Sequence, residues 1–210
     1  MGYGISYTVL IFEMMELTKN TTFDIRYIYG FDNVYDFCLD NILPFVTNGI
    51  MFKMSVGRNN VLADSAILRN VAYIANNALD ESKRIELTQK IKQILNGRTL
   101  SAGSINYLIN SPKLTEMMDT FAAYAENVNA GVGLKNISTV YYNQDQVIHI
   151  RDSFTAAVAM SSTRIEKYES YSSINSKGWY IGDGMLYVYT DGKQYTDNWF
   201  DYVNPYYMPG

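Results

Sequence analysis

The 210-residue sequence contains a single cysteine, Cys38, and a single histidine, His149. One cysteine cannot form a disulfide within the chain, and one histidine without a partner histidine or cysteine cannot make a zinc site. These absences argue against a metallohydrolase and against a triad that depends on histidine. We predict that Cys38 is a small buried hydrophobe and that His149 is a structural residue on a strand.

Basic charge is also scarce, because 17 lysines and arginines face 21 aspartates and glutamates, a net charge of -4. The basic residues are scattered, so we expect no nucleic-acid partner. No apolar stretch reaches the roughly 18 to 20 residues of a membrane-spanning helix, so we expect no membrane contact. The first residues lack the basic region of a secretory signal, so export would need a signal outside this chain.

What the sequence does contain is enough apolar sequence, 48% of all residues, to bury a substantial core in one large or two small domains. Apolar residues at spacings of three and four predict helices in the first half. The core faces expected from this spacing are Tyr7, Leu10, Ile11, Met14 and Leu17; Phe31, Tyr35, Cys38, Leu39 and Ile42, capped by Asp32; Ala66, Ile67, Val71, Ile74 and Ala78; Ile85, Ile91, Ile94 and Leu95; and Leu114, Met117, Met118 and Phe121, after Ser111-Pro112.

The period of the apolar pattern falls from about 3.6 to 2 between Asn127 and Asn136, which marks a change from helices to strands. Strands are expected at 140–142, 147–150, 154–160 and 185–190, the last forming a hairpin with 193–196 across Asp191-Gly192. Helices followed by strands predict two layers or domains. We place a helical domain at residues 1–127, a linker at 128–137 and a strand domain, incomplete, at 138–210.

The last fifty residues, Ser161 to Gly210, hold nine of the 19 tyrosines and both tryptophans. Composition alone favours packing of these rings in a β-core, although rings on irregular backbone also suit sugars. Glu166 and Glu169 flank Lys167, which fits either a general acid/base pair or a solvated charged strand. Gly182-Asp183-Gly184 is not a nucleotide loop, because it lacks the third glycine and the Lys-Ser/Thr ending.

The order of the residues adds a resemblance that composition does not show. It rests on a series of short motifs, which are Asn48-Gly49, Met54-Ser55-Val56-Gly57-Arg58, Met160-Ser161-Ser162, Arg164, Tyr168-Glu169, Asn175, Lys177-Gly178-Trp179-Tyr180, Asp183-Gly184-Met185, Tyr187-Val188-Tyr189, Tyr195, Trp199, Val203-Asn204-Pro205-Tyr206 and Met208-Pro209-Gly210. This series resembles the family 8 polysaccharide lyases, which include hyaluronate, chondroitin AC and xanthan lyases.

The resemblance implies an α+β fold built as a multidomain fragment. The helices would be the C-terminal helices of an incomplete α/α toroid, and the strands would be the first antiparallel strands of a large β-sandwich domain. The polymer would bind in a cleft between the two. On this interpretation the chain is an internal piece of a longer protein that is secreted, and that we expect to be a monomer at full length.

The resemblance also implies a reaction, the β-elimination of a uronic-acid-containing glycan, for which the family supplies Asn, His, Tyr and Arg. Gly2-Tyr3-Gly4 matches the segment that carries the catalytic tyrosine, just before an amphipathic helix, so Tyr3 takes that role; a helix-start aromatic is the structural alternative. The family's histidine and asparagine would precede Met1. This chain alone is therefore expected to be inactive, or nearly so.

Substrate-binding roles are implied for Arg58, Glu169, Asn175 and Asn204, each with strand or turn structure as the alternative. Further cleft arginines of the family are replaced by Val56 and Leu62, which weakens the case for a highly anionic substrate such as hyaluronan. The anionic polysaccharide partner is therefore left open among hyaluronan, chondroitin and xanthan-like polymers. No cofactor is expected, since the sequence does not support a calcium site. The alternatives are a non-catalytic carbohydrate-binding remnant of such a lyase and a purely structural piece.

Overall fold

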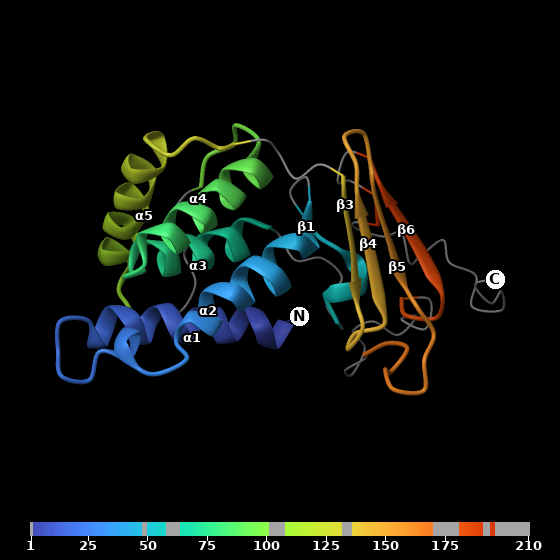
Figure 1. Ribbon diagram of the computed structural model, residues 1–210, viewed down its shortest axis with the longest axis horizontal. Coiled ribbons are helices and arrows are strands. Elements are labelled where there is room, and N and C mark those ends of the chain that lie inside the picture. The colour runs from blue at the N-terminus through green and yellow to red at the C-terminus, as the bar shows by residue number, and fades with distance from the viewer. Residues whose placement is uncertain are drawn as a thin grey trace. The chain divides into compact units, whose positions relative to one another are not determined.

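The computed structural model describes residues 2–47, 50–57, 64–100, 108–131, 136–169, 181–190 and 194–195. The chain divides into two compact units, one of helices and one built around a sheet (Figure 1). The helical unit comprises Tyr3–Gly49 and Ala63–Gly133, and the sheet unit comprises Ile50–Leu62 and Leu134–Gly210. None of the described helices is long and apolar enough to cross a membrane. The predicted order of helices before strands is confirmed, whereas the domain limits stay a prediction.

The helical unit consists of long helices joined by short helical turns. Its elements are α1 (Gly2–Thr18), a 3₁₀ turn (Ile25–Tyr27), α2 (Asp32–Asp36), a π-helical stretch (Phe37–Ile42), a 3₁₀ turn (Leu43–Phe45), β1 (Val46–Thr47), α3 (Asp64–Asn76), α4 (Glu81–Leu95) and α5 (Ser111–Glu126). Helix α3 contributes buried residues from Ile67 to Ala75 and lies against α1, where the rings of Tyr73 and Phe12 pack 4.8 Å apart.

The face that α1 buries is not the predicted one. Met15 and Phe12 are fully buried, whereas the expected core residues Leu10, Met14 and Leu17 are exposed. The periodicity was ambiguous because α1 carries apolar residues on both sides, and spacing cannot choose between two apolar faces. Thr8 helps to fix the observed choice, since its hydroxyl accepts a hydrogen bond from the Asn70 amide of α3 over 3.3 Å.

The second predicted core face is confirmed, and it runs through α2 into the π-helical stretch. Its members Phe31, Tyr35, Cys38, Leu39 and Ile42 are all buried. The predicted cap is wrong, because Asp32 is the first residue of the helix and Phe31 precedes it without a side-chain capping bond. The chain enters this helix from a turn already in helical conformation, so no side-chain cap is made.

Helices α4 and α5 both begin with side-chain caps. The carboxylate of Asp80 accepts hydrogen bonds from the backbone N–H groups of Ser82 and Lys83, and the Asn110 side chain accepts one from Lys113. Such caps satisfy N–H groups that the first turn of a helix leaves without partners. Ser111 was expected to be the cap and Pro112 the first residue of the helix; both instead lie in the first turn of α5, so the helix begins one residue earlier than predicted.

The sheet unit is built on a four-stranded antiparallel sheet in the order β3-β4-β5-β6. Its strands are β3 (Ile137–Tyr141), β4 (Gln146–Ile150), β5 (Thr155–Ala159) and β6 (Met185–Tyr189). The register places Ile148, Ala157 and Tyr187 in one row on the buried face. The other face is more open, and there the Nδ1 atom of His149 lies 2.9 Å from Ser138 Oγ, as expected for a structural histidine on a strand.

Residues 50–57 lie far from the sheet in the sequence but belong to the same unit. They form β2 (Ile50–Met51) and a 3₁₀ turn (Lys53–Ser55). The ring of Phe52 stacks on Tyr189 of β6 with centroids 5.0 Å apart, and both side chains are fully buried. This segment therefore packs on the buried face of the sheet. The predicted hairpin partner of β6 lies mostly outside the described residues.

Candidate functional site

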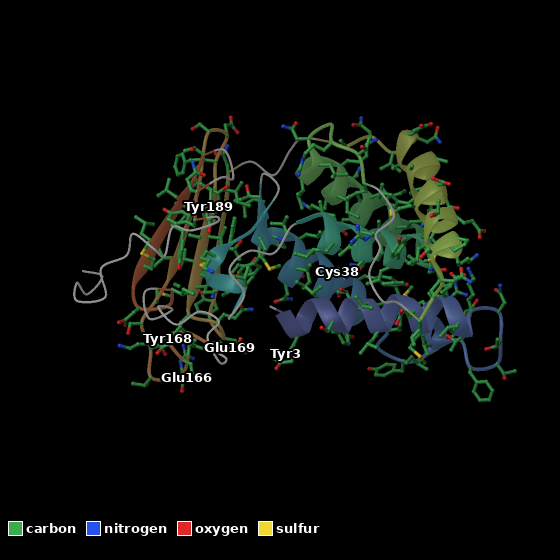
Figure 2. The ribbon with its side chains drawn as sticks, turned by 180° about the vertical axis from the view of Figure 1, so that it is seen from behind. Tyr3, Cys38, Glu166, Tyr168, Glu169 and Tyr189 are labelled. Carbon is green, nitrogen blue, oxygen red and sulfur yellow. The ribbon has the colours of Figure 1, made fainter. Side chains whose placement is uncertain are left out.

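The sheet unit contains a cavity of about 200 Å³ beside the segment that follows β5. We call it the Glu169 cavity; its polar side chains are those of Gln144, Gln146, Glu166, Lys167, Tyr168 and Glu169, and Gly57 and Gly182 also line it. In Figure 2 the labelled Glu166, Tyr168 and Glu169 follow one another along this segment, below Tyr189 of β6. The cavity thus joins residues that are more than a hundred positions apart in the sequence.

Gly57 is in direct contact with the Glu169 carboxylate. A Cβ atom built on Gly57 would lie 2.5 Å from Glu169 Oε2, closer than real Cβ contacts allow. Gly57 also has a φ of +62°, in the left-handed region that favours glycine. The position therefore favours glycine for two separate reasons, the backbone conformation and the space that the carboxylate occupies.

A second glycine holds the backbone of the same segment. A Cβ atom on Gly182 would overlap the carbonyl oxygen of Lys167. The Lys167 ammonium lies 3.1 Å from Asp183 Oδ2, and this hydrogen bond lowers the pKa of the Asp183 carboxyl. Lys167 is therefore fixed at both its backbone and its side chain.

Arg164 and Asp145 tie the start of the segment to the turn between β3 and β4. The guanidinium of Arg164 donates to Asp145 Oδ1 and to the carbonyl of Tyr142. Met160 N–H donates to the carbonyl of Asp145 over 2.8 Å. These bonds fix the path of residues 160–164, so that the next residues reach the cavity.

Gln146 contributes an unused acceptor on the wall of the cavity. Its amide nitrogen makes a long hydrogen bond of 3.4 Å to the Met54 carbonyl. Its Oε1 atom is buried and has no hydrogen-bond partner among the residues that the structure describes. A buried acceptor without a partner is costly, and a ligand hydroxyl or a water would satisfy it.

The tyrosines of β6 have a framework role instead. Tyr187 and Tyr189 are fully buried, and burial raises the pKa of both hydroxyls. The Tyr187 hydroxyl donates to the Ile181 carbonyl over 2.8 Å. For these two rings the composition-based expectation of a β-core is confirmed.

Tyr3, the predicted catalytic tyrosine, belongs to the helical unit. Its side chain is 78% exposed, so its hydroxyl is accessible to a ligand. The helix begins one residue before it, at Gly2, so Tyr3 lies in the first turn of α1 and not ahead of the helix as expected. The GYG sequence did not interrupt the helix because neither glycine is followed by a proline or another strong breaker.

The remaining predicted residues differ in how far the structure describes them. Glu169 is at the Glu169 cavity, whereas Arg58, Asn175 and Asn204 lie outside the described residues. Arg58 directly follows Gly57 in the sequence. The binding roles of all four stay predictions.

The sequence did not indicate the two glycines of the site whose roles come from contacts with distant segments of the chain. Gly182 was considered only within a rejected nucleotide loop, and Gly57 received no role of its own. The signal that could have found Gly57 is its place beside Arg58 in a resemblance motif. Within the described ranges no group of three or more histidine, cysteine, aspartate or glutamate side chains is placed to hold a metal ion.

Comparison with known proteins identifies relatives along the chain. Residues 136–210 match the family model described as polysaccharide lyase family 8, super-sandwich domain. A hyaluronate lyase of Staphylococcus aureus (strain NCTC 8325 / PS 47) is 27% identical over 211 residues, which cover 95% of this chain and 25% of the relative. A xanthan lyase of Bacillus sp. (strain GL1) is 26% identical over 217 residues, covering 100% of this chain and 23% of the relative. The chain thus spans about a quarter of the length of these curated relatives.

Solved structures share the fold. A Streptomyces coelicolor A3 chondroitin AC lyase in complex with chondroitin sulphate matches 99% of this chain and 30% of its own, with a TM-score of 0.79 and 22% identity. A Paenibacillus xanthan lyase matches 100% of this chain and 20% of its own, with a TM-score of 0.77 and 21% identity. Residues 136–210 thus match polysaccharide lyase family 8, and the chain as a whole is similar in sequence to a hyaluronate lyase and a xanthan lyase.

Proposed function

We propose that this chain is part of a secreted lyase that cleaves a uronic-acid-containing glycan by β-elimination. The observation that carries the proposal is its similarity to a hyaluronate lyase over 95% of the chain. The substrate is an anionic polysaccharide of the hyaluronan, chondroitin or xanthan type. The helices would then be the end of an incomplete α/α toroid, and β3–β6 the start of a β-sandwich domain.

β-Elimination needs proton transfer at two places. The proton at C5 of the uronic acid is removed, the bond from C4 to the glycosidic oxygen breaks, a C4–C5 double bond forms, and the leaving oxygen gains a proton. A phenol close to the reacting atoms can take part in such transfers, and this is the role we assign to Tyr3. Its exposed hydroxyl on α1 supports the assignment.

The chain would supply substrate contacts from its sheet unit. We assign binding roles to Arg58, Glu169, Asn175 and Asn204, of which Glu169 lies at a cavity with polar walls. The base that removes the C5 proton and the polar group that stabilises the negative charge developing on the uronic-acid carboxylate would be the family's histidine and asparagine, from sequence outside this chain. Loss of a general base lowers rates on the order of 10²- to 10⁴-fold, so the chain alone should bind glycan without turning it over.

The test uses the chain itself with hyaluronan, chondroitin and xanthan. Binding is followed by calorimetric titration, and product by the ultraviolet absorbance of the unsaturated uronate. The proposal predicts saturable binding of at least one of these polymers, with little or no increase in absorbance. A folded chain that binds none of them would contradict it. The second candidate, a degenerate carbohydrate-binding remnant, gives the same result here; it is separated by fusing the chain to the remaining parts of a related lyase, where only the first candidate predicts elimination.

A further inference from the structure

We infer that Gly57 is a positioning residue for Glu169, and that its missing side chain keeps the Glu169 carboxylate at the cavity where it contacts a glycan. The contact with Gly57 is observed, whereas the glycan contact rests on the proposed function. Gly57 would thus contribute to ligand binding although it has no side chain that could contact a ligand.

The geometry at Gly57 leaves no room for a Cβ atom. The nearest atom to that position is Glu169 Oε2 at 2.5 Å, and the next is the carboxyl carbon of Glu169 at 3.7 Å. The carboxylate is the end of a flexible side chain, so a methyl group at position 57 would push it aside by rotation. The expected effect of such a change is a displaced carboxylate in a folded protein.

The segment that carries Glu169 is anchored close to this contact. Two residues earlier, the backbone carbonyl of Lys167 packs directly on Gly182, and the Lys167 side chain pairs with Asp183. Further back, Arg164 is bonded to Asp145. Since the backbone is held at these points, the side chain of Glu169 is the part that must move.

The chemistry of the cavity indicates which part of the glycan Glu169 meets. A carboxylate accepts hydrogen bonds, and a second carboxylate, Glu166, lines the same cavity; the cation that also lines it, Lys167, is paired with Asp183. Two carboxylates repel the carboxylate of a uronic acid and attract hydroxyl donors. We therefore assign this position to sugar hydroxyl groups of the polymer.

The experiment compares Gly57→Ala, Glu169→Ala, the double variant and Gly184→Ala. Gly184 is the matched control because it lies in the same unit with a φ of +82° and has open space around its Cβ position. We expect Gly57→Ala and Glu169→Ala each to weaken glycan binding roughly tenfold, the loss of one hydrogen bond to a charged group. The double variant should bind no more weakly than either single variant, and Gly184→Ala should bind as the wild type does.

Two further measurements keep the inference testable. Gly57→Asn introduces a side chain that tolerates the left-handed backbone, so it replaces Gly57→Ala if that variant does not fold. The carbon-13 resonance of the Glu169 carboxyl reports its surroundings without any ligand, and it should shift in the Gly57 variant but not in Gly184→Ala. If the wild type binds no glycan, the proposed function is wrong. The Glu169 resonance still tests in that case whether Gly57 positions the carboxylate. A Gly57 variant with an unchanged Glu169 resonance, or with wild-type affinity, would overturn the inference.

Discussion

The backbone N–H of Lys53 donates a hydrogen bond to the hydroxyl of Tyr189, 2.8 Å away and 136 positions later in the sequence. Both residues are buried, and the ring of Tyr189 also stacks on Phe52. This bond anchors residues 50–57 to the sheet. Because Gly57 follows the 3₁₀ turn Lys53–Ser55 by only two residues, the bond also helps to hold the wall of the Glu169 cavity.

Replacing Tyr189 with phenylalanine should destabilise the sheet unit. The change keeps the ring but leaves the buried Lys53 N–H without its acceptor, which costs about 1–3 kcal/mol. Chemical denaturation measures the loss. The control is Tyr195→Phe, whose hydroxyl accepts from Val188 N–H at an exposed position where water can substitute. Equal losses of unfolding free energy in the two variants would show that the buried Lys53 hydrogen bond stabilises the fold no more than the exposed Val188 hydrogen bond does.

Neighbouring methionines of α1 test which face of the helix is buried. Met15 is fully buried, whereas Met14 is 44% exposed. We expect Met15→Ala to lower the free energy of unfolding by about 2–5 kcal/mol, because a cavity replaces the side chain. Met14→Ala should change it by about 0.5 kcal/mol or less. A larger loss of unfolding free energy for Met14→Ala than for Met15→Ala would instead support burial of the face predicted from the sequence.

Lys53 should make the stability of the chain depend on alkaline pH. Its side chain is buried, and burial lowers its pKa from 10.5 to about 8. Between these values the unfolded chain binds a proton that the folded chain does not, so stability rises with pH, by at most about 1.4 kcal/mol per unit. Below about pH 8 both states are protonated and this contribution is constant.

Urea unfolding at a series of pH values measures this slope. Lys53→Met should remove the rise between about pH 8 and about pH 9. The window ends there because Cys38, whose pKa burial raises from 9.0 to about 12, opposes the rise once the unfolded thiol ionises, and the buried Tyr187 and Tyr189 add to this opposition at higher pH. Identical slopes for the wild type and Lys53→Met would exclude Lys53 as the cause.

Cys38 should resist thiol reagents until the helical unit opens. Its side chain is fully buried, and burial raises its pKa to about 12, so very little reactive thiolate exists at neutral pH. Labelling with an aromatic disulfide reagent should be slow in buffer and complete at once in denaturant. Rapid stoichiometric labelling of the folded chain would contradict this burial.

Regular periodicity made much of the fold predictable. The apolar spacing of α5 and the alternation along β4 and β5 each allow one buried face, and the structure shows those faces buried. For helix α1 the apolar spacing predicted the wrong face, because apolar residues lie on both sides of the helix. Its buried face is chosen by contacts with Tyr73 and Asn70 of α3, which no local pattern encodes.

The candidate site was predictable only where a motif marked it. Glu169 and Arg58 came from the resemblance, but the packing of Glu169 on Gly57 depends on a left-handed backbone and a contact across more than a hundred positions. Neither property is visible in residue spacing. The same holds for Gly182, whose need for glycine comes from the backbone of Lys167.

The most direct test of the account is the rate of unsaturated-uronate formation by a reconstituted enzyme. In the S. aureus hyaluronate lyase, the matching quarter is replaced by this chain, which supplies Tyr3 while the relative supplies the rest. We predict that the folded chimera eliminates hyaluronan, that Tyr3→Phe lowers the rate on the order of 10²- to 10⁴-fold, and that Tyr7→Phe does not. A folded chimera that binds hyaluronan without forming product, or one whose rate Tyr3→Phe leaves unchanged, would contradict the claim that this chain carries the catalytic tyrosine of a lyase.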